Sequence, residues 1–305
     1  MVKSLVPNSI LSRLKNGEIL VFDGATGTYL QNHGLEPGAC PELMNDENPT
    51  IVEKMALTYF ESGSDIVLTN TFGCNKFRLK HYGLDNQVTK LNEKGASLAK
   101  NIAPSNCYVA GSIGPTGEFI QPVGNVSENE MYDVFTEQVI ALENGGADAV
   151  MIETQMAIEE VKIAIRATRE NTNLITMSSM VFDKGPRGFF TMMGITPEAA
   201  VNGMLESGAH IIGTNCGNGI EKMLEIATIM RKTTDSLLLV KSNAGIPTIK
   251  KEGIIYPETP EFMSEYYSKM LSLPINIIGG CCGTGPDHIK AIRTLVDSTK
   301  NTNEN

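Results

Sequence analysis

The stretch Asn144-Gly145-Gly146-Ala147-Asp148-Ala149-Val150-Met151-Ile152-Glu153-Thr154 contains a complete passage from a helix into a buried strand. Its glycines follow an amphipathic run, and Gly145 is the residue expected to take the left-handed conformation that ends many helices. The run from Ala149 to Ile152 is entirely apolar, as expected of a parallel strand buried on both faces. The strand then ends in an acidic residue, Glu153.

The same passage recurs elsewhere in the chain. Ser62-Gly63-Ser64-Asp65 and Ser207-Gly208-Ala209-His210 precede apolar runs in the same way. In total we predict eight strands, over 19–23, 65–71, 107–113, 149–154, 174–181, 210–216, 237–243 and 275–281. Amphipathic periods predict helices between them, most clearly over 51–61, 128–144, 197–207 and 220–232.

Eight strand–helix units predict an α/β fold, a single-domain (β/α)8 TIM barrel. We expect this barrel over residues 1–297 and a disordered tail over 298–305. A doubly wound sheet is the alternative. However, the first strand ends in Asp23-Gly24-Ala25-Thr26-Gly27, which does not match the dinucleotide-binding spacing G-x-G-x-x-G.

The composition limits the kinds of partner. The 305-residue chain has a formal net charge of −10, and 41% of its residues are hydrophobic. An acidic chain is a poor ligand for nucleic acid or for an anionic membrane surface. We find no signal peptide and no apolar run of bilayer length, and we therefore expect a cytoplasmic protein. In a reducing compartment, six cysteines indicate metal binding or catalysis rather than a disulfide scaffold.

Three cysteines fall at the ends of predicted strands, where barrels form their active sites. Cys216 ends the sixth strand, and Cys281 and Cys282 end the eighth. Three thiolates suit Zn²⁺, which takes four tetrahedral ligands and keeps one position open in catalytic sites. Adjacent strand residues point to opposite faces, so both Cys281 and Cys282 can face one ion only if the backbone turns. The glycines between 279 and 283 permit such a turn.

These residues have other interpretations. Cysteine is often a small buried hydrophobic residue, and Cys281 and Cys282 could form a vicinal disulfide. The glycine-rich loop before a helix starting near Pro286 could bind a phosphate group. The remaining cysteines and the histidines show no metal-ligand spacing, and we expect them to be structural; they are Cys40, Cys74, Cys107, His33, His81, His210 and His288.

Two acidic residues at predicted strand ends are candidates for binding an ammonium group. Asp23 ends the first strand and Glu153 the fourth, and a carboxylate inside a barrel mouth is costly unless it has a partner. Asp23 could instead cap the following loop or helix. The backbone N–H groups after the first strand could bind a carboxylate, although a simple tight turn is equally consistent with them. They belong to Gly24, Ala25, Thr26, Gly27 and Thr28.

In combination these phrases resemble the homocysteine S-methyltransferase family, and most of all the N-terminal homocysteine-binding module of cobalamin-dependent methionine synthases. The resemblance extends from residue 22 to residue 284. It is carried by Phe22-Asp23-Gly24-Ala25-Thr26-Gly27-Thr28, Thr69-Asn70-Thr71-Phe72-Gly73, Gly111-Ser112-Ile113-Gly114-Pro115-Thr116-Gly117, Glu153-Thr154-Gln155, Gly213-Thr214-Asn215-Cys216, Asn243-Ala244-Gly245-Ile246-Pro247 and Gly279-Gly280-Cys281-Cys282-Gly283-Thr284.

The resemblance implies a zinc-dependent transfer of a methyl group to the thiol of homocysteine, which gives methionine. Cys216, Cys281 and Cys282 would bind the zinc and serve catalysis, and the homocysteine sulfur would supply the fourth ligand. Asn243 would lie beside the metal. The chemistry is reasonable without the family, since a thiol of pKa about 8.5 is deprotonated by metal binding and becomes a nucleophile.

The resemblance also implies which residues bind the amino and carboxylate groups of homocysteine, and what the methyl donor is. Asp23 and Glu153 would hold the amino group, and the amides of residues 24–27 the carboxylate. Because the resemblance covers only the homocysteine module, we expect a methylated corrinoid, such as methylcobalamin, to arrive on a separate carrier protein. The alternatives are a small onium donor, such as betaine or S-methylmethionine, and a non-catalytic barrel that binds zinc and a thiol. The stretch Gly188–Met193 could shape a donor pocket, form a docking face or serve ordinary packing.

Overall fold

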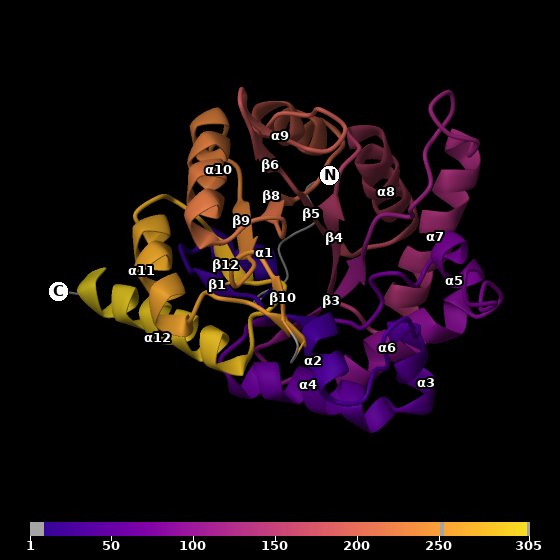
Figure 1. Cartoon of the computed structure of the whole chain (residues 1–305), viewed down its shortest axis with the longest axis horizontal. Coiled ribbons are helices and arrows are strands. Elements are labelled where there is room, and N and C mark those ends of the chain that lie inside the picture. Colours follow the sequence, from indigo (N-terminus) through magenta and orange to yellow (C-terminus); the bar gives the residue numbers. More distant parts are fainter. Residues whose placement is uncertain (1–8, 251–252, 304–305) are drawn as a thin grey trace.

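Eight parallel strands form a ring at the centre of the computed structural model, which describes residues 9–250 and 253–303. Figure 1 looks onto this ring and the helices that surround it. The strand order is β1-β12-β9-β8-β5-β4-β3-β2, and a parallel bridge between Phe22 and Ile66 joins β1 to β2. The barrel strands are β1 (Leu20–Val21), β2 (Ile66–Leu68), β3 (Tyr108–Ile113), β4 (Ala149–Gln155), β5 (Ile175–Met180), β8 (Ile211–Asn215), β9 (Leu238–Ser242) and β12 (Ile277–Gly280).

One helix packs outside the ring after each barrel strand. These are α4 (Pro49–Glu61), α6 (Val88–Ile102), α7 (Glu128–Asn144), α8 (Ile158–Asn171), α9 (Pro197–Glu206), α10 (Ile220–Thr233), α11 (Pro260–Leu271) and α12 (Pro286–Asn303). Shorter helices lie at the floor and in the loops: α1 (Ile10–Lys15), α2 (Thr26–Asn32), η1 (Pro41–Leu43), α3 (Met44–Glu47) and α5 (Lys76–Lys80). Each predicted strand matches one barrel strand, with β4 extending one residue beyond its predicted end, and the predicted (β/α)8 barrel is confirmed.

The two ends of α7 show how particular residues begin and end a helix of the barrel. Ser127 and Glu130 form a reciprocal capping box that satisfies backbone N–H groups at the start of the helix. At its other end the prediction was wrong by one residue. Gly145 has a φ of −71°, and it is Gly146, with a φ of 92°, that takes the left-handed conformation. The predicted left-handed glycines Gly63 and Gly208 are confirmed, with φ values of 99° and 91°.

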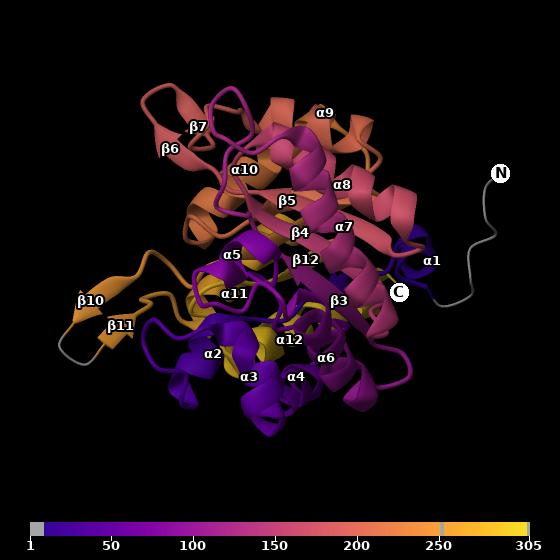
Figure 2. The same cartoon turned by 90° about the vertical axis from the view of Figure 1, so that its right-hand side faces the viewer.

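The core has two layers, as expected of a barrel whose strands are buried on both faces. An outer layer lies between strands and helices, and an inner layer fills the ring. Ile10 and Leu14 of α1 pack into the inner layer and close the floor of the barrel. Figure 2 shows α1 on the side of the ring opposite the β6–β7 and β10–β11 hairpins.

The hairpins β6–β7 (Asp183–Gly185 and Gly188–Phe190) and β10–β11 (Thr248–Lys250 and Gly253–Ile255) were not predicted. They follow β5 and β9, and both project from the side of the barrel on which the strands end (Figure 2). The last helix, α12, continues to Asn303. It therefore extends beyond residue 297, where we expected the barrel to end and a tail over 298–305 to begin.

Candidate metal centre and substrate cavity

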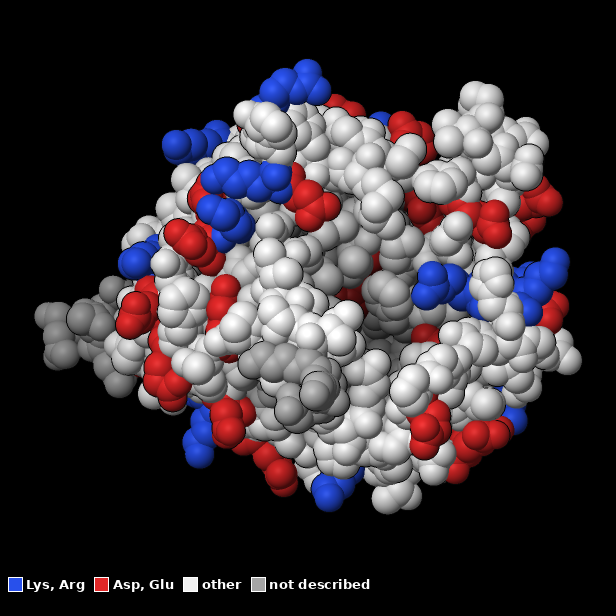
Figure 3. All heavy atoms as spheres, in the orientation of Figure 1, with Lys and Arg blue, Asp and Glu red and all other residues white. Residues whose placement is uncertain are grey.

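A cavity of about 490 Å³ opens at the carboxyl ends of the barrel strands. Figure 3 shows the surface hollowed at this place, with acidic atoms visible in the hollow. Its wall includes residues 24–28 after β1, Glu153 of β4 and Lys241 of β9. Cys216, Cys281 and Cys282 also line it. The convergence of polar strand ends that the sequence predicted is therefore present.

The sulfur atoms of Cys216, Cys281 and Cys282 all lie within 4.8 Å of one another. The Sγ atoms of Cys216 and Cys282 are 3.8 Å apart. Zinc–sulfur bonds of about 2.3 Å in a regular tetrahedron place two sulfurs about 3.8 Å apart, so this pair already has the separation that zinc requires. Within the described residues this is the one such cluster of histidine, cysteine and acidic side chains.

A tight turn brings both adjacent cysteines to the cluster. The N–H of Thr284 donates to the carbonyl of Cys281, and Gly283 has a φ of 79°. A Cβ atom at Gly280 would lie 2.0 Å from Oγ1 of Thr284, so the turn leaves no room for a side chain there. The predicted glycine-assisted turn is confirmed. Cys281 and Cys282 are both free thiols in this structure.

The three thiols influence one another's acidity. The hydrogen bond with Cys281 lowers the pKa of Cys216, but the contact with Cys282 and burial raise it more, to about 11. The hydrogen bond with Cys216 lowers the pKa of Cys282, but the contact with Cys281 and burial raise it more, to about 12. Without a cation the cluster therefore favours neutral thiols. Three thiolates at this spacing need a positive ion between them.

The other residues expected near the cluster lie beside it. The side-chain oxygen of Asn243 accepts a hydrogen bond of 3.1 Å from the N–H of Cys282 and so supports the cysteine turn. Gly24, Ala25, Thr26 and Gly27 line the cavity. However, the N–H of Ala25 already donates to the carbonyl of Thr284, at 2.9 Å. That amide is engaged, contrary to the expectation that the whole segment is available to a substrate carboxylate.

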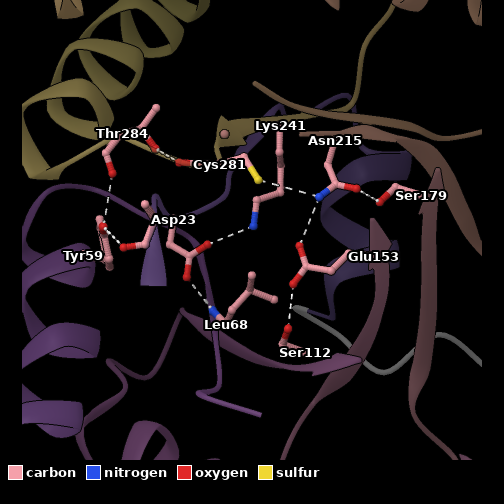
Figure 4. Close-up of polar contacts among 12 residues, drawn as sticks. Asp23, Tyr59, Leu68, Ser112, Glu153, Ser179, Asn215, Lys241, Cys281 and Thr284 are labelled. Carbon is pink, nitrogen blue, oxygen red and sulfur yellow. Dashed lines mark hydrogen bonds and ion pairs between the residues drawn. The ribbon is translucent and has the colours of Figure 1, made fainter. Parts of the chain in front are cut away.

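Glu153 is 5% exposed and borders the cavity. It accepts a hydrogen bond of 2.6 Å from Ser112 and a longer one of 3.4 Å from Asn215. Burial raises the pKa of Glu153, which Lys241 and Ser112 partly oppose. Asn215 also lies 3.7 Å from the sulfur of Cys281, so one buried amide connects the acidic residue to the cysteine cluster (Figure 4).

Asp23 is not among the residues that line the cavity, and it does not cap α2, which was the alternative interpretation. One of its oxygens accepts from the N–H of Leu68 at 2.6 Å, and the other pairs with Lys241 at 3.1 Å. The two charged side chains are each 1% exposed. Lys241 was missed in the sequence, although a lysine inside the apolar run Leu237–Asn243 was the signal that could have revealed it. Burial lowers the pKa of Lys241, but Asp23 and Glu153 raise it more, so the ammonium stays charged.

The remaining cysteines and histidines lie away from the cluster. Cys40 and Cys74 pack together in a separate apolar group, and Cys107 precedes β3 at the barrel floor. His210 precedes β8 at the same end, and its ring accepts the N–H of Thr176 at 2.9 Å. His288 lies in the first turn of α12, where it contacts the carbonyl of Glu258. Packing and hydrogen bonding account for these residues.

Fold and site together define a (β/α)8 barrel protein with a candidate three-cysteine metal centre at its mouth. The model of the family described as "Homocysteine S-methyltransferase" matches residues 20–296. The chain belongs to this family.

Two curated relatives are about 30% identical to the chain over the regions that match. The methionine synthase of Mycobacterium leprae (strain TN) is 31% identical over 91% of this chain, and that of Mycobacterium tuberculosis (strain ATCC 25618 / H37Rv) is 30% identical over 98%. The matched regions cover only 24% and 26% of these two proteins. The chain thus spans about a quarter of the length of the relatives it matches.

Solved structures confirm the fold. The homocysteine methyltransferase MmuM from Escherichia coli, in its metallated form, superposes with a TM-score of 0.77 at 21% identity. The superposition covers 93% of this chain and 98% of that one. A methyltransferase from Methanosarcina mazei gives a TM-score of 0.59 at 13% identity, covering 95% and 98% of the two chains. Among the described residues, no helix combines the length and apolarity needed to cross a membrane.

Proposed function

We propose that the chain is a zinc-dependent methyltransferase that transfers a methyl group to the thiol of homocysteine and so forms methionine. The observation that carries this proposal is the group of three cysteine sulfurs at the wall of the cavity, beside a buried carboxylate. Membership of the homocysteine S-methyltransferase family supports the acceptor. The curated relatives, both named methionine synthase, support the product.

The donor set fits zinc. Three soft sulfur ligands select zinc over magnesium or calcium, and the 3.8 Å separation of Cys216 and Cys282 matches a tetrahedral edge. Three protein ligands leave one position for a fourth donor. A zinc ion held here would lower the pKa of an acceptor thiol and keep it as a nucleophile at neutral pH.

The protein's own residues would orient the acceptor. Glu153 borders the cavity close to the cysteines, where it can receive an ammonium group. Residues 24–28, which include the start of α2, also line the cavity and can receive the carboxylate, except for the engaged amide of Ala25. The two ends of an amino acid would thus be fixed, with its side-chain thiol directed to the cluster. Fixing the reacting groups in this way lowers the entropic part of the barrier.

For the methyl donor we propose a methylated corrinoid on a separate protein. Exposed apolar side chains lie in two loops on the side of the barrel where the cavity opens (Figure 2), which favours docking of a macromolecule over closure on a small cation. Five lie in the loops after β5 and β9, with exposures from 40% to 89%: Met192, Met193, Ile246, Ile249 and Ile254. Of the uses considered for Gly188–Met193, the exposure of Met192 favours a docking face.

A donor screen tests the whole proposal. The zinc-loaded protein is incubated with homocysteine and, in separate reactions, free methylcobalamin, a methylcorrinoid protein, betaine or S-methylmethionine, and methionine is measured. Methionine formed from a methylcorrinoid is the expected result. Turnover only with a small onium compound would refute the donor and retain the acceptor chemistry. Binding of homocysteine without methionine from any donor would favour a non-catalytic binding barrel.

A further inference from the structure

Lys241 is a buried cation at the centre of the barrel mouth. In β9 side chains alternate between the two faces, so Lys241 points into the ring as Leu239 does two residues earlier. It is 1% exposed. Removing an ammonium group from water is costly unless it is paired. Packing alone therefore does not explain why a lysine occupies this position.

The partner of Lys241 is Asp23. Its Nζ lies 3.1 Å from one oxygen of Asp23 and 4.2 Å from the centroid of the Phe22 ring. The second oxygen of Asp23 accepts the N–H of Leu68. Both oxygens of this carboxylate are thus engaged within the protein. Lys241 lines the cavity but Asp23 does not, and the ammonium group of Lys241 lies between the carboxylates of Asp23 and Glu153 (Figure 4).

The contacts of Glu153 differ from those of Asp23. It lines the cavity, and its hydrogen-bond partners, Ser112 and Asn215, are neutral. Among residues 9–250 and 253–303, no ion pair involves Glu153. With Asp23 and Glu153 ionised, the two carboxylates and Lys241 carry a net charge of −1. The remaining negative charge lies on the carboxylate that faces the cavity.

We propose that Lys241 is a specificity-determining residue, which occupies Asp23 as an internal partner and leaves Glu153 as the single carboxylate that receives the acceptor's ammonium group. This inference rests on the proposed function, and it replaces the expectation that Asp23 and Glu153 share the amino group. One unpaired carboxylate complements one ammonium group. The cavity therefore selects thiols that carry an amino group over thiols that lack it.

Binding measurements on the zinc-loaded full chain test this division of roles. The probes are homocysteine and 4-mercaptobutanoate, which is homocysteine without its amino group. Calorimetry gives the dissociation constant of each probe for the wild type, D23N, the double variant D23N/K241M and E153Q. Zinc content and the circular dichroism spectrum are recorded for every variant.

The double variant gives the decisive result. Replacing both members of a buried pair by neutral groups of similar size is often tolerated, and the amide introduced by D23N retains an oxygen for the N–H of Leu68. In D23N alone, Lys241 loses its partner and turns to Glu153, so homocysteine should bind about tenfold or more weakly. In D23N/K241M, Glu153 is free again, and affinity should return to within about fivefold of the wild type. E153Q should lose most of the preference for homocysteine over 4-mercaptobutanoate.

Two outcomes would overturn the inference. If D23N/K241M binds homocysteine as weakly as D23N, Asp23 itself receives the ammonium group. If E153Q retains the wild-type preference for homocysteine, Glu153 does not receive it. Should D23N fail to fold, the comparison of the double variant with E153Q still decides. Failure of the proposed function is distinguishable, because the wild-type protein would then not bind homocysteine at all.

Discussion

Asn215 binds the backbone and the side chain of Thr154 at the same time. Its Oδ1 accepts from the N–H of Thr154 at 2.8 Å, and its Nδ2 donates to Oγ1 of Thr154, also at 2.8 Å. Thr154 has a φ of 59°, and Cys216, next to Asn215, has a φ of 62°. Left-handed conformations are uncommon outside glycine, above all for a β-branched residue. The amide of Asn215 therefore stabilises a strained segment between Glu153 and the cysteine cluster.

Removing this amide should destabilise the barrel. The buried hydroxyl of Ser179 also donates to Oδ1 of Asn215, at 2.6 Å. Asn215→Ala leaves this hydroxyl and the half-buried groups of Thr154 without a partner, and we expect a loss of about 2–4 kcal/mol in the free energy of unfolding. Urea denaturation measures it. Asn202, an exposed residue of α9, provides the matched control. Its alanine variant should change stability by less than about 0.5 kcal/mol. An equally small effect of Asn215→Ala would contradict the stabilising role.

Each cysteine of the cluster should be necessary for zinc binding. The purified wild type should contain about one zinc per chain, and Cys216→Ala, Cys281→Ala and Cys282→Ala should each lose most of it together with methyl transfer. Metal analysis by mass spectrometry measures the occupancy. The barrel has its own two-layer core, so the variants should remain folded. Cys107→Ala is the matched control. Full zinc occupancy in all three cluster variants would refute the site.

Two glycines in the first loop should respond oppositely to alanine. A Cβ atom at Gly24 would lie 2.6 Å from the carbonyl oxygen of Thr284 and 2.8 Å from the ring of Tyr59. Gly24→Ala should therefore cost about 1–3 kcal/mol of stability. Gly27, in α2, has open space around its Cβ position, so Gly27→Ala should be neutral or stabilise by up to about 1 kcal/mol. Equal stabilities of the two variants in urea denaturation would contradict this contrast.

Variants of the docking face should change the KM for the carrier protein and leave the affinity for homocysteine unchanged. Met192 and Ile249, in the loops after β5 and β9, are 74% and 89% exposed, and charge at these positions should weaken contact with an apolar partner surface. We expect Met192→Glu and Ile249→Glu to raise the KM for a methylcorrinoid protein several-fold or more, with little change in homocysteine affinity. Steady-state kinetics with each substrate varied in turn measures both. Leu57→Glu, at an exposed position of α4, is the control. Unchanged KM values for both docking-face variants would exclude docking there.

His210 should make stability fall in weakly acidic solution. Burial, together with the nearby Arg169, lowers the pKa of His210 from 6.5 to about 4. The unfolded chain therefore takes up a proton that the folded chain does not. Stability from the neutral ring is fully present above pH 6.5 and is lost as the pH falls from 6.5 towards 4. His210→Asn, which keeps an acceptor for the N–H of Thr176, should reduce this slope. Urea midpoints between about pH 4 and 8 measure it, and identical slopes would contradict the assignment.

The sequence alone was sufficient to predict the strand pattern and the cysteine cluster. Strands buried on both faces require continuous apolar runs, so all eight could be located from hydrophobicity. Parallel strands in a barrel all end at the same face, so Cys216, Cys281 and Cys282 had to approach one another once their strands were assigned. The glycines around Cys281 and Cys282 indicated the turn, because few other residues tolerate that backbone conformation.

Only the tertiary structure decided which charged groups are paired. Asp23 and Lys241 lie 218 positions apart, on strands separated by β12. Whether their side chains meet depends on the stagger of the strands around the ring, which no local pattern encodes. The same holds for the left-handed conformations of Thr154 and Cys216, which long-range hydrogen bonds support. The sequence determined which residues reach the barrel mouth, and the closed sheet determined which of them neutralise one another and which face the substrate.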